Sequence, residues 1–289
     1  MRQPSSPLVS VCIPLYNGGR YIREAIESVL AQNLTDWELV ITDDGSNDGS
    51  AEIVASYSDP RIRYLLNPAR LGAEGNWNRC VNEGRGLYRK LLCHDDRLHP
   101  DCLSRQVAAI SLVGNESVSL VASARQIVGP GGNHILTRRW KRIDQLIARR
   151  TAVRQIVRSG TNQVGEPGAV LFRASDWLAL NGFSARYPYV IDLGFWFELL
   201  GRGDCFYIAE PLSDFRVSAQ SWSFQLGDQQ ARQFTELVYE VSRRVDSPLS
   251  RFDCLFGYCK AKAGAFLRHM IYRMVCDVRQ GPRNESKNV

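Results

Sequence analysis

Two adjacent pairs of aspartates are the residues whose type and spacing point most directly to chemistry. Asp43 and Asp44 follow one short apolar run, and Asp95 and Asp96 follow another, directly after His94. Adjacent carboxylates repel each other unless a cation or hydrogen-bond donors offset their charge. Mg²⁺ often binds through one or two carboxylates together with substrate phosphates. The second pair therefore predicts a site for Mg²⁺ or Mn²⁺ and for a substrate that carries a diphosphate.

The first pair also has an ordinary structural explanation. Aspartate, glycine and serine favour turns and helix caps, so Asp43-Asp44-Gly45-Ser46 alone is compatible with a simple turn. A second acidic pair after another strand favours a functional interpretation of both. We interpret His94 as a side chain that orients its loop rather than as a metal ligand. No G-x-G-x-x-G fingerprint follows the first apolar run, and the chain has no P-loop or G-x-S-x-G elbow.

The elements that must position these residues alternate between short apolar strands and helical patterns over the first 130 residues. This alternation predicts a mainly parallel sheet covered by helices. The expected strands span 8–13, 37–41, 62–66, 88–93 and 118–128, and the expected helices span 20–32, 50–57, 75–82 and 100–112. Loops at the carboxyl ends of parallel strands meet in one crevice, so both acidic pairs and the loop Pro14-Leu15-Tyr16-Asn17 should lie together.

The pattern changes after the turn Gly129-Pro130-Gly131-Gly132. We expect a basic amphipathic helix over 143–157, a strand over 169–172, helices over 174–180 and 192–200, edge strands over 205–208 and 213–217, and helices over 228–245 and 248–278. The predicted class is therefore α/β, with a second half of α+β character and a helical extension at the carboxyl end.

Composition indicates the class of protein and the compartment to which this chain belongs. Of its 289 residues, 44% are hydrophobic and 23% are charged, which is typical of a globular protein. We find no secretory signal and no uninterrupted apolar run of about 18 residues, so we expect no transmembrane helix. The eight cysteines form no C-x-x-C pair, which predicts reduced thiols and a cytoplasmic location rather than a disulfide framework or zinc.

The net charge of +6 is concentrated in two segments. Residues 138–158 hold eight basic residues against one acidic residue, and residues 243–287 hold ten against four. A phosphate-bearing substrate or an anionic lipid surface explains such patches as well as nucleic acid does, and we expect no nucleic acid. The basic carboxyl-terminal helices could lie peripherally on the inner face of a membrane, or pack against the rest of the chain or a second subunit.

Four segments, VSVCIPLYNGGRYIREAIESVLAQ, WELVITDDGSNDGS, LGAEGNWNRCV and LLCHDDRLHPDCL, resemble the nucleotide-binding half of family-2 glycosyltransferases in order and spacing. The resemblance runs from about Pro7 to Leu103 and continues more loosely, through VGEPGAVLFR, IDLGFWFELLGRGD and AEPLSDFRVS, to about Ser218. It implies a GT-A fold and an inverting, metal-dependent transfer of a sugar from a nucleotide-diphosphate donor, most commonly UDP-sugar, to a saccharide or lipid-linked acceptor in surface polysaccharide or glycolipid assembly.

The resemblance assigns roles in the nucleoside pocket to residues of the first two loops. Pro14, Tyr16 and Asn17 would line this pocket, and Asp44 would hydrogen-bond the base. Arg70 would contact the diphosphate or the base, or serve only to hold its loop.

The second acidic pair corresponds to the family's D-x-D-type motif. Asp95 would lie near the ribose and the metal, and Asp96 would ligate the metal that bridges both phosphates. Many relatives have a histidine shortly after the F-R segment, where this chain has Ser218. Arg216 could bind phosphate through its guanidinium, and the serine would leave the metal with fewer protein ligands.

The general base is expected on the acceptor side of the site. Asp192 corresponds to an aspartate that precedes an aromatic helix in the family, and it would take the proton of the acceptor hydroxyl. It could instead cap its helix, and Glu166 is the rival base. Trp196 and Trp222 could stack on sugar faces, although core packing also explains Trp196.

The implied organisation is a GT-A domain over 1–220, divided into a nucleotide-binding half over 7–130 and an acceptor half over 131–220. Residues 221–289 form a basic helical extension, and a homo-oligomer is compatible with it. Two other functions stay open at this stage. One is a nucleotidyltransferase on a related sheet, and the other is a non-catalytic nucleotide-sugar binder, suggested by Ser218.

Overall fold

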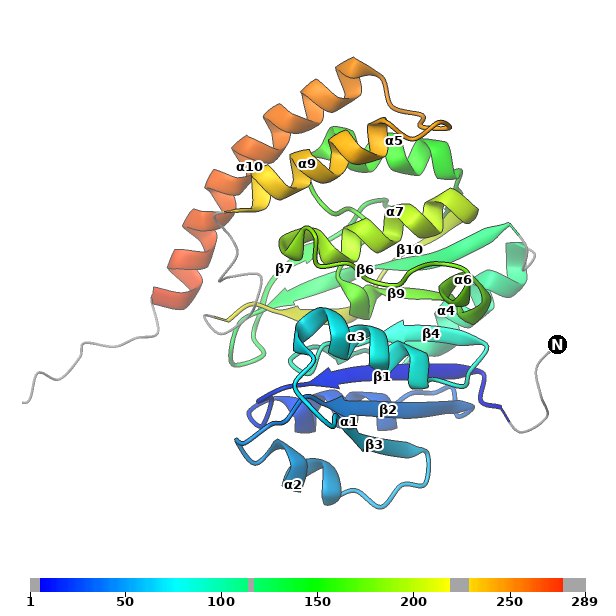
Figure 1. Ribbon diagram of the computed structural model, residues 1–289, viewed down its shortest axis with the longest axis vertical. Coiled ribbons are helices and arrows are strands. Elements are labelled where there is room, and N and C mark those ends of the chain that lie inside the picture. The colour runs from blue at the N-terminus through cyan, green and yellow to red at the C-terminus, as the bar shows by residue number, and fades with distance from the viewer. Residues whose placement is uncertain (1–5, 114–116, 219–228, 278–289) are drawn as a thin grey trace, which may run out of the picture.

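The strands of the protein form one sheet that runs through the middle of the molecule (Figure 1). The computed structural model describes residues 6–113, 117–218 and 229–277, with side chains described as far as residue 265. Within these residues the sheet has ten strands, in the order β3-β2-β1-β4-β9-β6-β10-β5, with β7 paired to β6 and β8 to β10. The strands are β1 (Val9–Leu15), β2 (Trp37–Asp43), β3 (Ile62–Leu66), β4 (Tyr88–Leu91), β5 (Arg97–Leu98), β6 (Val118–Val128), β7 (His134–Arg138), β8 (Gln145–Ile147), β9 (Val170–Arg173) and β10 (Asp204–Arg216).

Helices cover both faces of this sheet. They are α1 (Ile22–Leu30), α2 (Ser50–Ala55), α3 (Gly72–Glu83), α4 (Cys102–Val113), α5 (Arg149–Ser159), α6 (Ala174–Leu178), α7 (Ile191–Arg202), α9 (Gln230–Ser242) and α10 (Arg251–Asp277), with short 3-10 helices η1 (Pro167–Ala169) and η2 (Pro188–Val190). Residues of α1, α2 and α4 form one hydrophobic core, and residues of α3, α5, α7 and α9 form the other.

Strand β1 shows why the sheet needs both layers. Val11 and Ile13 pack into the core with α1, whereas Cys12 packs into the core with α3, because successive side chains of a strand point to opposite faces. β1 pairs in parallel with β2 on one side and with β4 on the other. Most paired residues of the sheet lie in the parallel pairings β1–β2, β2–β3, β1–β4 and β6–β10, so the predicted mainly parallel α/β sheet is confirmed. The remaining pairings are antiparallel, which makes the sheet mixed.

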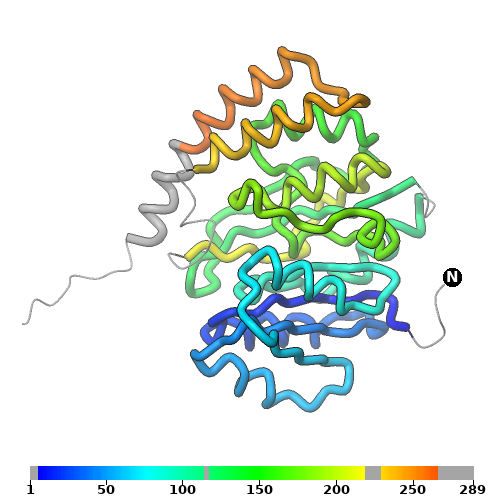
Figure 2. The backbone as a smooth tube through the Cα atoms, in the orientation of Figure 1, coloured from blue at the N-terminus to red at the C-terminus, as the bar shows by residue number. Residues whose placement is uncertain are grey.

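The helices α5, α9 and α10 build an outer layer on the α7 side of the sheet (Figure 2). α10 packs against both α5 and α9. Its contact with α5 is so close that a Cβ on Gly257 would collide with the carbonyl oxygen of Val157, and a Cβ on Gly160 with the backbone of Ala261. In the described part of the chain, no helix combines the length and the apolar character that crossing a membrane requires.

Two expectations about secondary structure are wrong. The helix expected over 143–157 begins only at Arg149, because residues 145–147 pair with β10 as the antiparallel strand β8. The edge strands expected over 205–208 and 213–217 are one interior strand, β10, which pairs with β6 along its length. Register shifts on both sides of Pro211 accommodate a residue that would otherwise interrupt the ladder. The short strands β5 and β7 were not predicted.

The glycine contact between α10 and α5 can be tested by Gly257→Ala. Alanine in a helix interior is normally favoured over glycine by about 1 kcal/mol, but here its Cβ would meet the Val157 carbonyl. We expect the free energy of unfolding in urea to fall by about 1–3 kcal/mol. Gly201→Ala in α7 is the matched control, since a Cβ there meets nothing within 4 Å, and it should stabilise the protein. Stabilisation by both substitutions would contradict the close approach.

Candidate functional site

The loops that follow β1 and β2 are joined by hydrogen bonds at one edge of the sheet. The amide of Asn17 donates to the Ser46 hydroxyl at 2.9 Å, and the Asn17 side-chain oxygen accepts the amide of Asn47 at 2.9 Å. Asn17 has a φ of 49°, a left-handed conformation that asparagine tolerates better than most residues. The amide of Gly18 donates to the Ser50 hydroxyl at 3.0 Å. The predicted meeting of these two loops is therefore observed.

Asp43 and Asp44 are both buried and have different partners. Asp43 accepts hydrogen bonds from the Ser46 hydroxyl and the Tyr64 hydroxyl, each at 2.6 Å, so it closes the turn that its sequence suggested. Asp44 accepts from the Asn67 side chain at 2.6 Å and from the amides of Leu71 and Gly72 at 2.7 and 2.9 Å. Asp44 thus fixes the segment 67–72 beside the first loop.

That segment carries Arg70, whose guanidinium lies 4.1 Å from the centre of the Tyr16 ring. Both side chains are exposed, and they form a cation–π pair beside the carboxyl end of β1. Pro14 is buried within β1, in register with Thr42 of β2, one residue before the carboxyl end of the strand.

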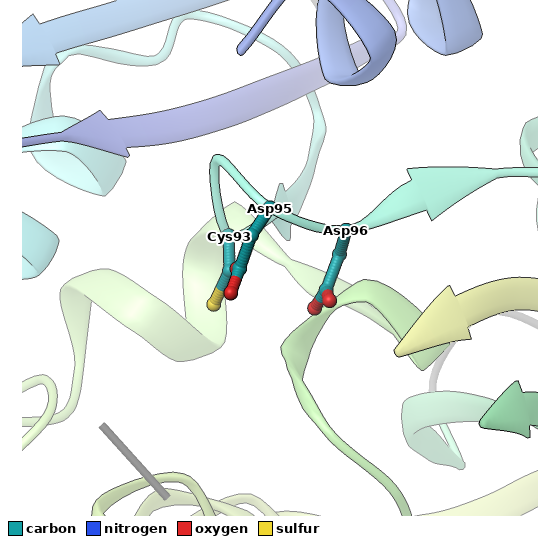
Figure 3. Close-up of side chains that lie close together, drawn as sticks. All are labelled: Cys93, Asp95 and Asp96. Atoms are coloured by element: carbon teal, nitrogen blue, oxygen red, sulfur yellow. The ribbon is translucent and has the colours of Figure 1, made fainter. Parts of the chain in front are cut away.

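The loop after β4 brings three metal-ligating groups together (Figure 3). Side-chain ligand atoms of Cys93, Asp95 and Asp96 all lie within 4.8 Å of one another. Asp96 is 2% exposed, and one of its oxygens accepts the backbone amide of Arg216 at 2.8 Å. Burial, and then the charge of Asp95, raise the pKa of Asp96 well above its usual range. The two carboxylates are therefore poorly neutralised by the protein, and two oxygen donors of this kind suit a hard divalent cation.

Arg216, at the end of β10, holds this loop in place. Its Nε donates to the carbonyl of Asp95 at 2.7 Å, its Nη1 to the carbonyl of Pro130 at 3.2 Å, and its Nη2 to Glu24 at 2.7 Å. The guanidinium also lies 4.4 Å from the centre of the Tyr21 ring and is 1% exposed. Every nitrogen of the guanidinium binds protein, so the observed contacts of Arg216 support the acidic loop, whereas the sequence suggested that it could bind phosphate.

A second group of charged residues faces the acidic loop from the other half of the chain. Arg125 of β6 is 2% exposed and donates from Nε to Glu166 at 2.6 Å. Burial would raise the pKa of Glu166, but the charges of Arg125 and Arg138 outweigh it, so this pKa lies below its usual value. Glu166 is therefore a fixed negative charge.

Asp192 lies in the first turn of α7 and is held by Asn162. The Asn162 amide nitrogen donates to Asp192 at 2.9 Å and to the carbonyl of Gly165 at 2.9 Å. The helix begins after Val190 and has no side-chain cap, so Asp192 does not serve as its N-cap. Burial, and then the charge of Glu166, raise the pKa of Asp192 to about 7. A carboxylate with this pKa can accept a proton near neutral pH.

The thiol of Cys93 shows that these segments share one electrostatic environment. Burial raises its pKa well above the usual value, and the charges of Asp96, Asp95, Asp192 and Glu166 raise it further. The structure therefore brings together the predicted metal residues, the predicted base and its rival. The other predicted residues, Pro14, Tyr16, Asn17, Asp44 and Arg70, lie at or after the carboxyl ends of β1, β2 and β3, which are parallel to β4 and so end at the same edge of the sheet.

Other expected site residues have structural positions. Trp196 is fully buried in an aromatic cluster with Phe172 and Phe195, and its indole N–H donates to the carbonyl of Gly165 at 3.0 Å. Trp222 lies outside the described residues. Ser218 is buried at the end of the described segment. His94 packs against Gly18, where an added Cβ would lie 2.6 Å from its ring, which agrees with a loop-orienting role.

Three residues of the site were missed from the sequence: Cys93, Arg125 and Asn162. Arg125 could have been found from the sequence, since a charged residue inside the apolar run 118–128 requires a buried partner. No sequence pattern indicates the role of Asn162, because one of its acceptors, Asp192, is far from it in sequence and the other is the backbone carbonyl of Gly165.

Comparison with known proteins identifies the sequence as similar to glycosyltransferases. Residues 10–172 match the family described as "Glycosyl transferase family 2". The chain is 30% identical over 265 residues to EpsE of Bacillus subtilis, which is named as a glycosyltransferase, and the match covers 86% of each chain. TuaG of the same organism, named for teichuronic acid biosynthesis, is 37% identical over 103 residues, or 35% of this chain and 41% of TuaG. The chain spans only 35% of the length of an uncharacterised glycosyltransferase of Rickettsia typhi.

Solved structures share the fold. TarS 1-349 of S. aureus, in complex with UDP, superposes with a TM-score of 0.65 at 16% identity, covering 90% of this chain and 72% of that one. The mannosyltransferase PcManGT of Pyrobaculum calidifontis, in complex with GDP-Man and Mn²⁺, superposes with a TM-score of 0.61 at 14% identity, covering 98% and 79%. The arrangement of sheet and flanking helices is thus of the GT-A type.

The support that Arg216 gives the acidic loop predicts a large loss of stability in Arg216→Met. The substitution leaves the carbonyls of Asp95 and Pro130 without this donor, whereas Glu24 keeps its ion pair with Arg97, so we expect the free energy of unfolding to fall by about 2–4 kcal/mol. Arg70→Met is the control, because that guanidinium is exposed and the change should stay within about 0.5 kcal/mol. Similar values for both variants in urea denaturation would contradict a supporting role for Arg216.

Proposed function

Because this chain belongs to glycosyl transferase family 2, we propose that it transfers a sugar from a nucleotide-diphosphate donor to an acceptor hydroxyl with inversion at the anomeric carbon. The observation that carries the proposal is the meeting of two kinds of carboxylate around Cys93. Asp95 and Asp96 form a poorly neutralised pair, and Asp192 has a pKa of about 7. The pair Asp95 and Asp96 would hold the divalent cation of a diphosphate donor, and Asp192 would accept the proton of the acceptor.

The loop after β1, with Tyr16 and Asn17, and the segment 67–72, with Arg70, offer a surface that suits a nucleoside. The exposed Tyr16 ring and the Arg70 guanidinium provide stacking and positive charge, and Asn17 lies in the same loop. A carboxylate offers about four acceptor sites, and Asp44 uses three of them inside the protein. One site on its second oxygen is left, which fits a single N–H of a base. We propose a UDP-sugar as donor, supported by the shared fold with a UDP-bound structure.

Asp95 and Asp96 would hold Mg²⁺ or Mn²⁺ together with the donor phosphates. When bound, the cation would neutralise charge on the departing diphosphate. Arg216 supports this geometry, because its guanidinium donates to the Asp95 carbonyl and its backbone amide donates to a carboxylate oxygen of Asp96. Mg²⁺ and Mn²⁺ prefer oxygen ligands to thiols, so the aspartates and not Cys93 would be the ligands.

Asp192 would be the general base. The acceptor oxygen forms a bond to the anomeric carbon while its proton passes to Asp192, and the bond from that carbon to the phosphate oxygen breaks with its electron pair leaving on the nucleoside diphosphate. Glu166 is less suited to this role, because the ion pair with Arg125 keeps its pKa low. Glu166 instead raises the proton affinity of Asp192.

We propose a saccharide or lipid-linked saccharide as acceptor, in surface polysaccharide assembly at the cytoplasmic face of a membrane. The similarity to TuaG supports this setting. A thermal-shift screen of nucleotide diphosphates and their sugars, with and without Mn²⁺, tests the donor directly, because a ligand that binds only the folded state raises the melting temperature. If no donor shifts the melting temperature and none is hydrolysed or transferred, the enzymatic function is refuted.

The metal role of the second acidic pair predicts that Asp96→Ala abolishes donor hydrolysis. With Mn²⁺ present, the rate should fall by at least about 100-fold, the scale of losing one contact that stabilises transition-state charge. Asp101→Ala is the matched control, since that carboxylate is exposed and bonds only Asn33 in the described structure. Undiminished hydrolysis in Asp96→Ala would remove this residue from the metal site.

The base role of Asp192 predicts both a loss and a pH profile. Asp192→Asn should lower the transfer rate by about 10²–10⁴-fold while donor binding is kept. In the wild type kcat/KM should rise with pH through an inflection near pH 7, or below it where bound cation lowers the pKa, because only the deprotonated carboxylate accepts the proton. The inflection should disappear in Asp192→Asn. If it is instead removed by Glu166→Gln, the rival residue is the base.

A further inference from the structure

The outward side of α10 carries an apolar stripe that the described parts of the protein do not cover. Phe252, Leu255, Phe256 and Cys259 recur at positions i, i+3, i+4 and i+7, which places them on one side of the helix. Phe252 and Leu255 are 65% and 61% exposed, and Phe256 is 39% exposed. The opposite side, with Asp253, Gly257 and Ala261, is buried against the rest of the protein. We name the stripe the outer α10 face.

Basic side chains border the outer α10 face. Lys260 lies 5.7 Å from the centre of the Phe256 ring, and Arg158 of α5 lies 5.6 Å from the same ring. Lys262 lies 4.7 Å from the centre of the neighbouring Tyr258 ring, and Arg251 begins the helix. By helical position, Lys260 borders one side of the stripe, and Arg251 and Lys262 border the other.

Negative charge is absent from this surface over residues 251–265. Asp253 is the sole acidic residue of that segment, and it is 1% exposed. Its carboxylate accepts the Ser250 amide at 3.0 Å and lies 3.4 Å from Arg154 and 3.7 Å from Arg158. The exposed charge that residues 251–265 contribute is therefore positive only.

We propose that the outer α10 face docks the protein on an anionic phospholipid surface. The phenylalanine and leucine side chains enter the region between headgroups and acyl chains, and the bordering lysines and arginines contact lipid phosphates. An apolar stripe with basic borders is the pattern of a helix that lies in the membrane interface. A second copy fits this face less well, because a symmetric contact would set the same basic borders against each other. The proposal does not depend on the transfer reaction.

The test is flotation of the full-length protein with vesicles of phosphatidylcholine alone and of equal parts phosphatidylcholine and phosphatidylglycerol. We expect at least about 10-fold stronger partitioning onto the anionic vesicles at low salt, weakened at high salt as screening increases. Phe252→Ser with Phe256→Ser, and separately Lys260→Glu with Lys262→Glu, should each remove most of this binding. Leu112→Ser with Leu178→Ser is the matched control, since both leucines are exposed on other helices.

Thermal unfolding of every variant establishes that the outer face, and not the fold, has been changed. Equal partitioning onto both vesicle types, or unchanged partitioning in both double variants, would overturn the proposal. A dimer detected by light scattering and broken by Phe252→Ser with Phe256→Ser would overturn it as well, by assigning the face to self-association. Donor hydrolysis in the absence of vesicles should be the same in these variants as in the wild type.

Discussion

The buried guanidinium of Arg216 is the interaction on which the acidic end of the sheet depends. It joins the end of β10 to α1 through Glu24, to the turn after β6 through Pro130, and to the loop after β4 through Asp95. These segments are far apart in sequence, and the guanidinium adds to the antiparallel pairing of β5 with β10 that begins directly after Asp96. Arg216 contacts the carbonyl of Asp95, and its own amide contacts Asp96, so it orders the loop without forming an ion pair with either carboxylate. The carboxylates therefore have no cationic side chain as an ion-pair partner in this loop, and a divalent cation would supply the positive charge.

A second buried arginine, Arg125, determines the charge of the two carboxyl groups that face the acidic loop, Glu166 and Asp192. Arg125 keeps Glu166 ionised, and burial, together with the resulting fixed charge, raises the pKa of the neighbouring Asp192. Two carboxylates in one site thus differ in proton affinity because one has a charged partner and the other has an amide and a like charge. Asn162 ties Asp192 to the carbonyl of Gly165, and Trp196 binds the same carbonyl from the core. The aromatic packing of α7 is in this way connected to the orientation of the proposed base.

The sequence was most informative where function and local structure require the same residues. The strand ends that carry Asp44 and Asp96 were predictable because apolar runs followed by acidic loops mark the carboxyl edge of a parallel sheet. The roles of Arg216 and Arg125 were not, because a guanidinium can bind a phosphate or a carbonyl, and only the tertiary neighbours decide which. The two edge strands expected on either side of Pro211 are the single strand β10, and the register shifts that keep this proline inside the sheet cannot be inferred from one sequence.

The outer layer adds a mechanical consequence to this arrangement. α10 approaches α5 at Gly257 and Gly160 with backbone against backbone, and such a contact allows much less sliding than one made by long flexible side chains. α5 in turn packs on α7, the helix that carries Asp192. A helix bound at a lipid surface would therefore fix the orientation of the sheet as well as its distance from that surface. An acceptor whose saccharide is tethered to a lipid diffuses in the plane of the same membrane. A protein held at that surface in a fixed orientation would meet this acceptor at a higher effective concentration near Asp192 than a protein free in solution.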